Sequence, residues 1–60
     1  MDKKQIKNLM DKLRQPIHIS YISKYILKVD EVTTKQQLDI LISEGYVKES
    51  YISEGYYVAI

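Results

Sequence analysis

The stretch 29–47, VDEVTTKQQLDILISEGYV, decides the fold of this 60-residue chain. Its inward-facing side chains recur at the spacing of a single helical stripe, formed by Thr34, Leu38, Leu41 and Ile42. Apart from Ile40, the residues between them are polar, as expected for a helix with one face on a core. The stretch therefore predicts an amphipathic helix on which the rest of the chain packs.

The same stretch carries signals for where this helix begins and ends. Thr33 and Gln36 match a capping box, and Asp30 is a competing N-cap three residues earlier. Gly45 can take the left-handed conformation that commonly closes a helix. We expect a helix over about 33–44.

Two further helices are predicted before it. Asp2 and Gln5 form a variant capping box at the start of a helix over about 3–14, which Pro16 ends. The inward stripe of this first helix is Ile6, Leu9, Met10 and Leu13.

The alternation at 17–19 predicts a short strand, and Ser20 can cap a second helix over about 21–28. The inward residues of that second helix are Ile22, Tyr25 and Ile26, and Val29 fills the corner before the next helix.

The C-terminal segment predicts a β-hairpin over about 46–60. Its tyrosines and β-branched residues favour strands, and Gly55 supplies the permissive backbone for the turn. Tyr56, Val58 and Ile60 share one face by the two-residue period, and we expect this face to pack on the helices.

The motif Leu38-x-x-Leu41-x-x-x-Gly45-Tyr46-Val47, followed by a hairpin ending Gly55-Tyr56-Tyr57-Val58, resembles the second half of a winged helix-turn-helix domain. The likeness extends more weakly over almost all 60 residues. It implies an α+β fold in one domain, 1–60, with three helices and a C-terminal two- or three-stranded β-wing. Winged helices bind DNA, RNA and proteins, so the resemblance specifies a fold more closely than a function.

Composition narrows the class of protein. The chain has no cysteine, and no apolar run approaches the ~20 residues that cross a bilayer, so we expect a cytoplasmic protein without a membrane segment. The net charge of +1 is unevenly distributed. Residues 1–28 carry seven basic and two acidic side chains, a net +5, whereas residues 29–60 carry two basic and six acidic ones, a net −4.

Catalysis has little support in the sequence. His18 is the only histidine, and a lone histidine between apolar neighbours is more often structural than catalytic. No cysteine nucleophile, glycine-rich phosphate loop or nucleophile elbow is present. We expect neither an enzyme nor a bound cofactor or metal.

The resemblance instead implies double-stranded DNA as partner, with the third helix in the major groove and the protein acting in transcription regulation. The DNA-contacting residues would be Ser20, Lys24 and Lys28 near phosphates, and Thr33, Lys35, Gln36 and Asp39 on the third helix. Because 30–44 carries four acids and one base, a monomer would bind weakly, and we expect a homodimer if DNA is the target.

A protein partner is the alternative. The third helix is acidic, and Tyr51 and Ile52 fall at the predicted wing tip, where they have no core to fill. Exposed aromatic and aliphatic groups often mark interfaces. The second hypothesis is therefore a winged-helix interaction module.

Overall fold

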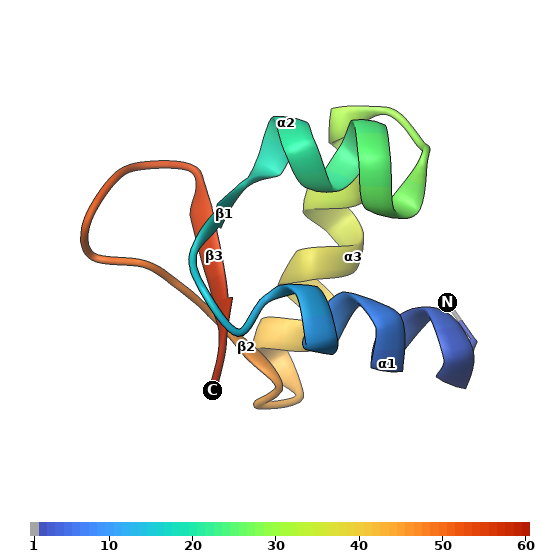
Figure 1. Ribbon diagram of the computed structural model, residues 1–60, viewed down its shortest axis with the longest axis horizontal. Helices are drawn as coiled ribbons and strands as arrows, with labels where there is room; N and C mark the ends of the chain where they lie inside the picture. Colours follow the sequence, from blue (N-terminus) through green and yellow to red (C-terminus); the bar gives the residue numbers. More distant parts are fainter. Residues whose placement is uncertain (1) are drawn as a thin grey trace.

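A computed structural model describes residues 2–60 (Figure 1). Along the described chain the elements are α1 (Lys3–Lys12), β1 (Ile17–His18), α2 (Ile19–Tyr21), the π-helical segment η1 (Ile22–Leu27), α3 (Glu31–Ser43), β2 (Val47–Glu49) and β3 (Tyr56–Ala59). Since α2 runs directly into η1, these residues form three helices and one antiparallel sheet of order β1-β3-β2. The expected α+β class is confirmed.

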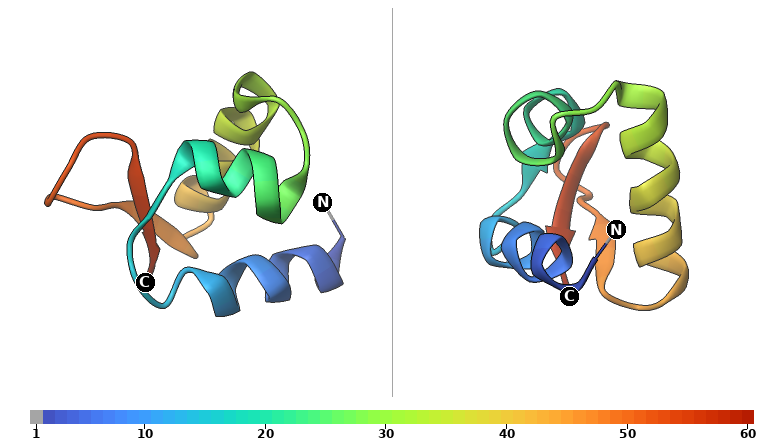
Figure 2. Two further views of the ribbon diagram at one scale, coloured as in Figure 1. Left: turned by 45° about the horizontal axis from the view of Figure 1, so that its top comes forward. Right: turned by 90° about the vertical axis from the view of Figure 1, so that its right-hand side faces the viewer.

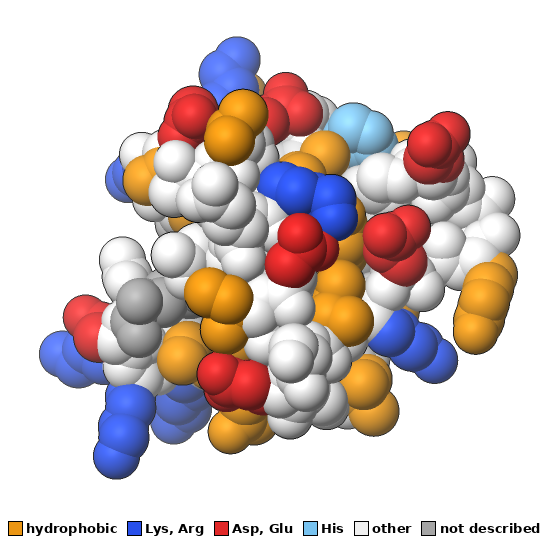
Figure 3. All heavy atoms as spheres, turned by 180° about the vertical axis from the view of Figure 1, so that it is seen from behind, with side chains coloured by type: hydrophobic (Ala, Val, Ile, Leu, Met, Phe, Trp, Pro, Cys, Tyr) orange, Lys and Arg blue, Asp and Glu red, His pale blue; other side chains and the backbone are white. Residues whose placement is uncertain are grey.

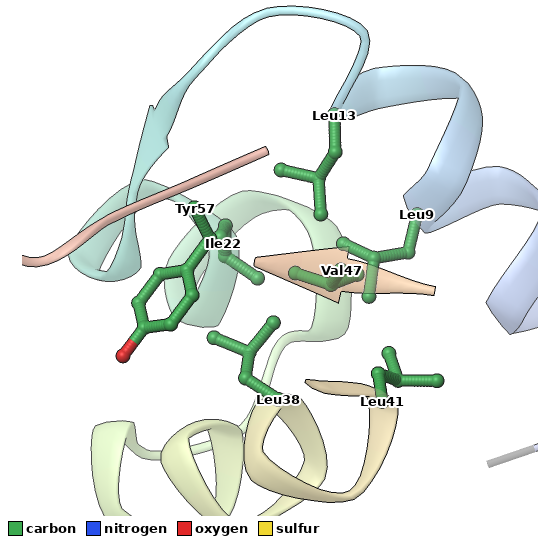
Figure 4. Close-up of a cluster of buried hydrophobic side chains, with 7 residues drawn as sticks. All are labelled: Leu9, Leu13, Ile22, Leu38, Leu41, Val47 and Tyr57. Atoms are coloured by element: carbon green, nitrogen blue, oxygen red, sulfur yellow. The ribbon is translucent and has the colours of Figure 1, made fainter. Parts of the chain in front are cut away.

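The helices lie on one side of the sheet (Figure 2). In the second view of Figure 2, α1 and α3 lie on opposite sides of β3. Seven buried side chains from α1, η1, α3, β2 and β3 converge to form the core, namely Leu9, Leu13, Ile22, Leu38, Leu41, Val47 and Tyr57 (Figure 4). The predicted stripes of the first and third helices supply four of the seven, and Thr34 is buried beside them. Apolar periodicity therefore identified correctly which sides of α1 and α3 face inward.

Local hydrogen bonds explain where α1 begins and where α3 ends. At the start of α1 the capping box is complete: Gln5 N–H donates to Asp2 Oδ1 at 2.8 Å, and Asp2 N–H donates to Gln5 Oε1 at 3.3 Å. At the end of α3, Gly45 has φ +85°. Its N–H donates to Ile42 O at 3.1 Å, and the N–H of Tyr46 reaches back to Leu41 O at 2.9 Å. This paired pattern closes the helix and turns the chain into β2.

The start of α3 differs from the expectation. The helix begins at Glu31, and Thr33 lies within its first turn. Asp30, the competing residue, occupies the N-cap position, although its side chain forms no cap hydrogen bond. The Thr33–Gln36 capping box is therefore wrong. Val29 does not fill the corner either, because its side chain is exposed.

The second helix begins at Ile19 rather than after Ser20. His18 occupies the N-cap position in extended geometry, and its Nδ1 accepts the N–H of Ser20 at 3.1 Å. The strand β1 leads directly into this cap, so no residues are left for a separate Ser20 cap.

The predicted inward position of Tyr25 is wrong, since its side chain is exposed. The prediction used a period of 3.6 residues, but η1 is a π-helix with wider turns. In the wider turn Ile22 and its neighbour Ser23 are buried, with Ile26 and Leu27 packed against the core.

The inward face of β3 is the opposite of the one predicted. Val47, buried at the start of β2, pairs directly with Ala59, and directly paired residues share a face of the sheet. Tyr57 and Ala59 therefore turn to the core, while Ile60 is 74% exposed. A shift of one residue moves every side chain of a strand to the other face.

Candidate nucleic-acid interface

The solvent side of α3 carries three of the predicted contact residues. Lys35, Gln36 and Asp39 are all exposed, and they lie away from the core-facing residue Leu38. Lys35 and Gln36 also line a shallow hollow of about 390 Å³ between α3 and Ile19 at the start of α2. The three side chains are thus available to a partner that approaches α3 from solvent.

Lys35 is not a free cation. Its Nζ donates to Asp39 Oδ1 at 2.7 Å in an ion pair one helical turn apart. This hydrogen bond raises the pKa of Lys35 above 10.5, against a lowering by burial and with a further rise from Tyr57. Because Lys35 is the only basic residue of α3, the helix presents little uncompensated positive charge.

Thr33 lies apart from Lys35. It is half-buried and lines a cavity of about 140 Å³ between α3, the end of η1 and the first turn of α1. Residues 33 and 35 are about 200° apart around a helix. The structure therefore does not bring Thr33 into one contact surface with Lys35.

The three residues expected near phosphates lie along the second helix and just after it. Ser20 is exposed, but its Oγ lies 2.8 Å from His18 Nδ1, so the hydroxyl takes part in the cap. The Nζ of Lys24 lies 5.5 Å from the centre of the Tyr25 ring. Lys28 is exposed, with left-handed backbone at φ +57°. Neither lysine forms an ion pair with any described residue.

The hairpin tip projects from the body of the protein (Figure 1). Tyr51 is 98% exposed and Ile52 is 84% exposed. The N–H of Ile52 donates to Ser50 Oγ at 3.2 Å, and Ser50 N–H donates to Tyr56 O at 2.8 Å, which holds the base of the loop. The predicted exposure of the two apolar tip residues is confirmed.

The charge on the α3 side is mixed. Figure 3 views this side and shows a basic group near its centre bordered by acidic ones, with further acidic groups on the hairpin. Several basic groups gather instead at the lower left, toward the start of α1. The lysines of the first helix therefore do not extend the surface formed by α3 and the hairpin.

His18 serves the fold. Its Nδ1 accepts the cap hydrogen bond, and its ring packs edge-on against Tyr56 with 5.1 Å between ring centres. Within residues 2–60, no three histidine, cysteine or acidic side chains lie close enough together to hold a metal ion.

An open groove of about 500 Å³ lies between the end of α1, β1, the start of α2 and β3, and it is not among the predicted sites. It is lined by Lys12, Gln15, Pro16, Ile17, His18, Tyr21 and Tyr56. Six of these residues lie within the stretch 12–21, and the β1–β3 pairing brings Tyr56 to them. No sequence motif marks the groove, although the basic character of residues 1–28 was visible.

None of the described helices has the length and apolar character needed to span a membrane. No protein family, curated protein or solved structure was found to match this chain.

Proposed function

We propose that this protein is a small DNA-binding regulator of the winged helix-turn-helix type, cytoplasmic, with α3 reading the major groove of duplex DNA. The observation that supports this most directly is the uncovered side of α3, which follows a short turn and has a hairpin beside it. This side carries Lys35, Gln36 and Asp39 together with the exposed apolar residues Val32 and Ile40. In a helix-turn-helix the second helix of the pair enters the groove and its exposed side chains reach base edges. Gln36 can pair with adenine and Lys35 with guanine.

The charges of this surface set the expected affinity. Asp39 neutralises Lys35, and phosphate contacts must then come from Lys24 and Lys28 on the second helix. Two lysines give only weak binding, because affinity for duplex DNA depends on the number of phosphates neutralised. We therefore propose that the protein acts as a homodimer, which doubles these contacts.

A duplex selected from a random-sequence pool provides the test. Fluorescence anisotropy on that duplex should show binding that weakens steeply with salt. The double variant Lys35→Ala/Gln36→Ala should lose the preference for the selected sequence over a scrambled one. The matched control Lys7→Ala/Asn8→Ala removes the same charge from exposed positions on α1 and should keep that preference. Preference that survives in the first variant would overturn readout by α3.

A protein partner is the second candidate, and the exposure of Tyr51 and Ile52 favours it. Apolar groups at a loop tip gain nothing from folding, so burial against a partner is what would stabilise them. Changing both to Ser should abolish capture of such a partner while the thermal unfolding midpoint stays unchanged. Unchanged capture by this variant would exclude the wing tip as the contact.

A further inference from the structure

None of the residues that line the groove beside β1 comes from α3. In the second view of Figure 2, β1 and α3 lie toward opposite sides of the molecule. The groove combines two tyrosine rings, an imidazole, an amide and one lysine. Of these, only Tyr21 lies on an element of the proposed duplex surface, the second helix. The volume of about 500 Å³ falls in the range of ligand sites. The groove is therefore a second place where this protein can hold a ligand.

The aromatic wall of the groove is fixed before any ligand arrives. His18 is held by its hydrogen bond from Ser20 N–H, and Tyr56 packs on the His18 ring. Tyr21 is half exposed, so part of its ring is free to contact a ligand. The ring of Tyr25, one turn further along, lies 4.8 Å from that of Tyr21 and continues the aromatic surface out of the groove.

The charge of the groove suits an anion. Lys12 lines it and forms no ion pair with any described residue, and Lys24 lies above the Tyr25 ring at the far end of the aromatic surface. Asp11 and Glu54 are the acidic residues nearest in sequence to the residues that line the groove, but neither of them lines it. A ligand that contacts both Tyr21 and Tyr25 therefore has Lys12 near one of its ends and Lys24 near the other.

We infer that this groove binds single-stranded nucleic acid, with one base stacked on Tyr21 and a phosphate beside Lys12. Aromatic platforms with basic groups along a shallow track are how proteins hold single strands, because every base offers a flat face and every linkage a negative charge. A track open along its length suits a strand better than a small molecule, which binding sites usually enclose.

Fluorescence anisotropy with an oligothymidylate of about 12 nucleotides tests the inference at low salt. Tyr21→Ala should weaken binding by roughly 5- to 100-fold, as expected for one lost stacking partner. Lys12→Gln should weaken binding and flatten its salt dependence by the equivalent of about one phosphate contact. Tyr46→Ala and Lys48→Gln make the same chemical changes at exposed positions outside the groove and should leave binding unchanged.

Equal losses in the groove and control variants, or no oligothymidylate binding by the native chain, would overturn the inference. So would competition by thymidine monophosphate as effective as by the strand, since that result would identify a small-molecule site. The double variant Lys35→Ala/Gln36→Ala should bind the oligothymidylate normally. Failure of the duplex proposal and failure of this one are therefore distinguishable. Thermal unfolding of each variant checks that the fold is retained.

Discussion

His18 and Gly55 are in direct contact: a Cβ atom added to residue 55 would lie 2.9 Å from His18 Nε2. The imidazole cannot simply move aside, because its Nδ1 accepts the N–H of Ser20 and caps the second helix. Ile19 N–H also donates to Gly55 O at 2.9 Å. The turn of the β2–β3 hairpin and the start of the second helix are thus joined at one point.

This contact predicts that the two glycines differ in their tolerance of alanine. Both have positive φ, +85° at Gly45 and +83° at Gly55, so each substitution should cost about 1–2 kcal/mol in backbone strain. Around Gly45 no atom lies within 4 Å of the added Cβ. Gly55→Ala should cost a further ~0.5–2 kcal/mol, the value of a helix N-cap. Urea denaturation of both variants measures the difference, and equal costs would show that the His18 contact contributes nothing.

A buried hydroxyl gives the second prediction. Thr34 is fully buried in α3, and its Oγ1 has no hydrogen-bond partner among the described residues. Thr34→Val replaces this hydroxyl with a methyl group of similar size and should stabilise the protein by about 1 kcal/mol, because an unpaired buried polar group is removed. The half-buried neighbour Thr33 is the control, and Thr33→Val should change the free energy of unfolding by less than about 0.5 kcal/mol. A destabilised Thr34→Val variant would indicate that the hydroxyl is hydrogen-bonded in solution.

The elements that could be predicted from sequence are those whose signals are local. The stripe of Leu38 and Leu41 and the capping box of Asp2 each depend on residues within a few positions of one another. The same holds for the left-handed Gly45. Helix geometry alone converts such spacings into a buried face or a helix end.

Some predictions are wrong because the deciding partner is distant in the sequence, and others because the local backbone is not a regular α-helix. The face of β3 was assigned from its own alternation, which both faces satisfy, and only the pairing of Val47 with Ala59 decides between them. The exposure of Tyr25 depends on a widened helical turn that the 3.6-residue period does not describe. In the candidate sites, six of the seven residues that line the groove lie within 12–21, but this stretch carries no binding motif. The pairing of β1 with β3, which adds Tyr56, depends on residues distant in the sequence.

The turn between the second and third helices gives the third prediction. Lys28 has left-handed backbone at φ +57°, where a residue with a Cβ is strained by about 1–2 kcal/mol. Lys28→Gly relieves this strain but adds ~0.4–1 kcal/mol of unfolded-state entropy, so a net stabilisation of up to about 1 kcal/mol is expected. Lys24→Gly, within η1, is the matched control and should instead destabilise by about 1 kcal/mol. The thermal unfolding midpoints of the two variants should therefore shift in opposite directions, and a loss of stability in both would contradict the strained turn.

The ion pair on α3 gives the last prediction, which separates duplex binding from protein binding. The hydrogen bond to Asp39 raises the pKa of Lys35, so the pair stabilises the fold fully below pH 10.5 and this contribution is lost as the pH rises through the higher folded-state value. Asp39→Asn should move the pKa of Lys35 back toward 10.5 in an NMR titration of its Cε protons. The same variant frees Lys35 and removes an acid from the proposed duplex surface.

If α3 binds duplex DNA, Asp39→Asn should therefore tighten binding by roughly 2- to 5-fold and steepen its salt dependence. The exposed Asp11 on α1 supplies the control, since Asp11→Asn changes the net charge equally but lies outside the α3 surface. An equal gain in both variants would reflect net charge alone. Weaker binding by Asp39→Asn to the selected and the scrambled duplex alike would contradict readout by α3, because removal of a carboxylate cannot weaken contacts to phosphate. A loss confined to the selected duplex would instead indicate that Asp39 accepts a hydrogen bond from a cytosine amino group. An acidic α3 that docks on a basic protein surface would instead lose affinity for that partner in the same variant.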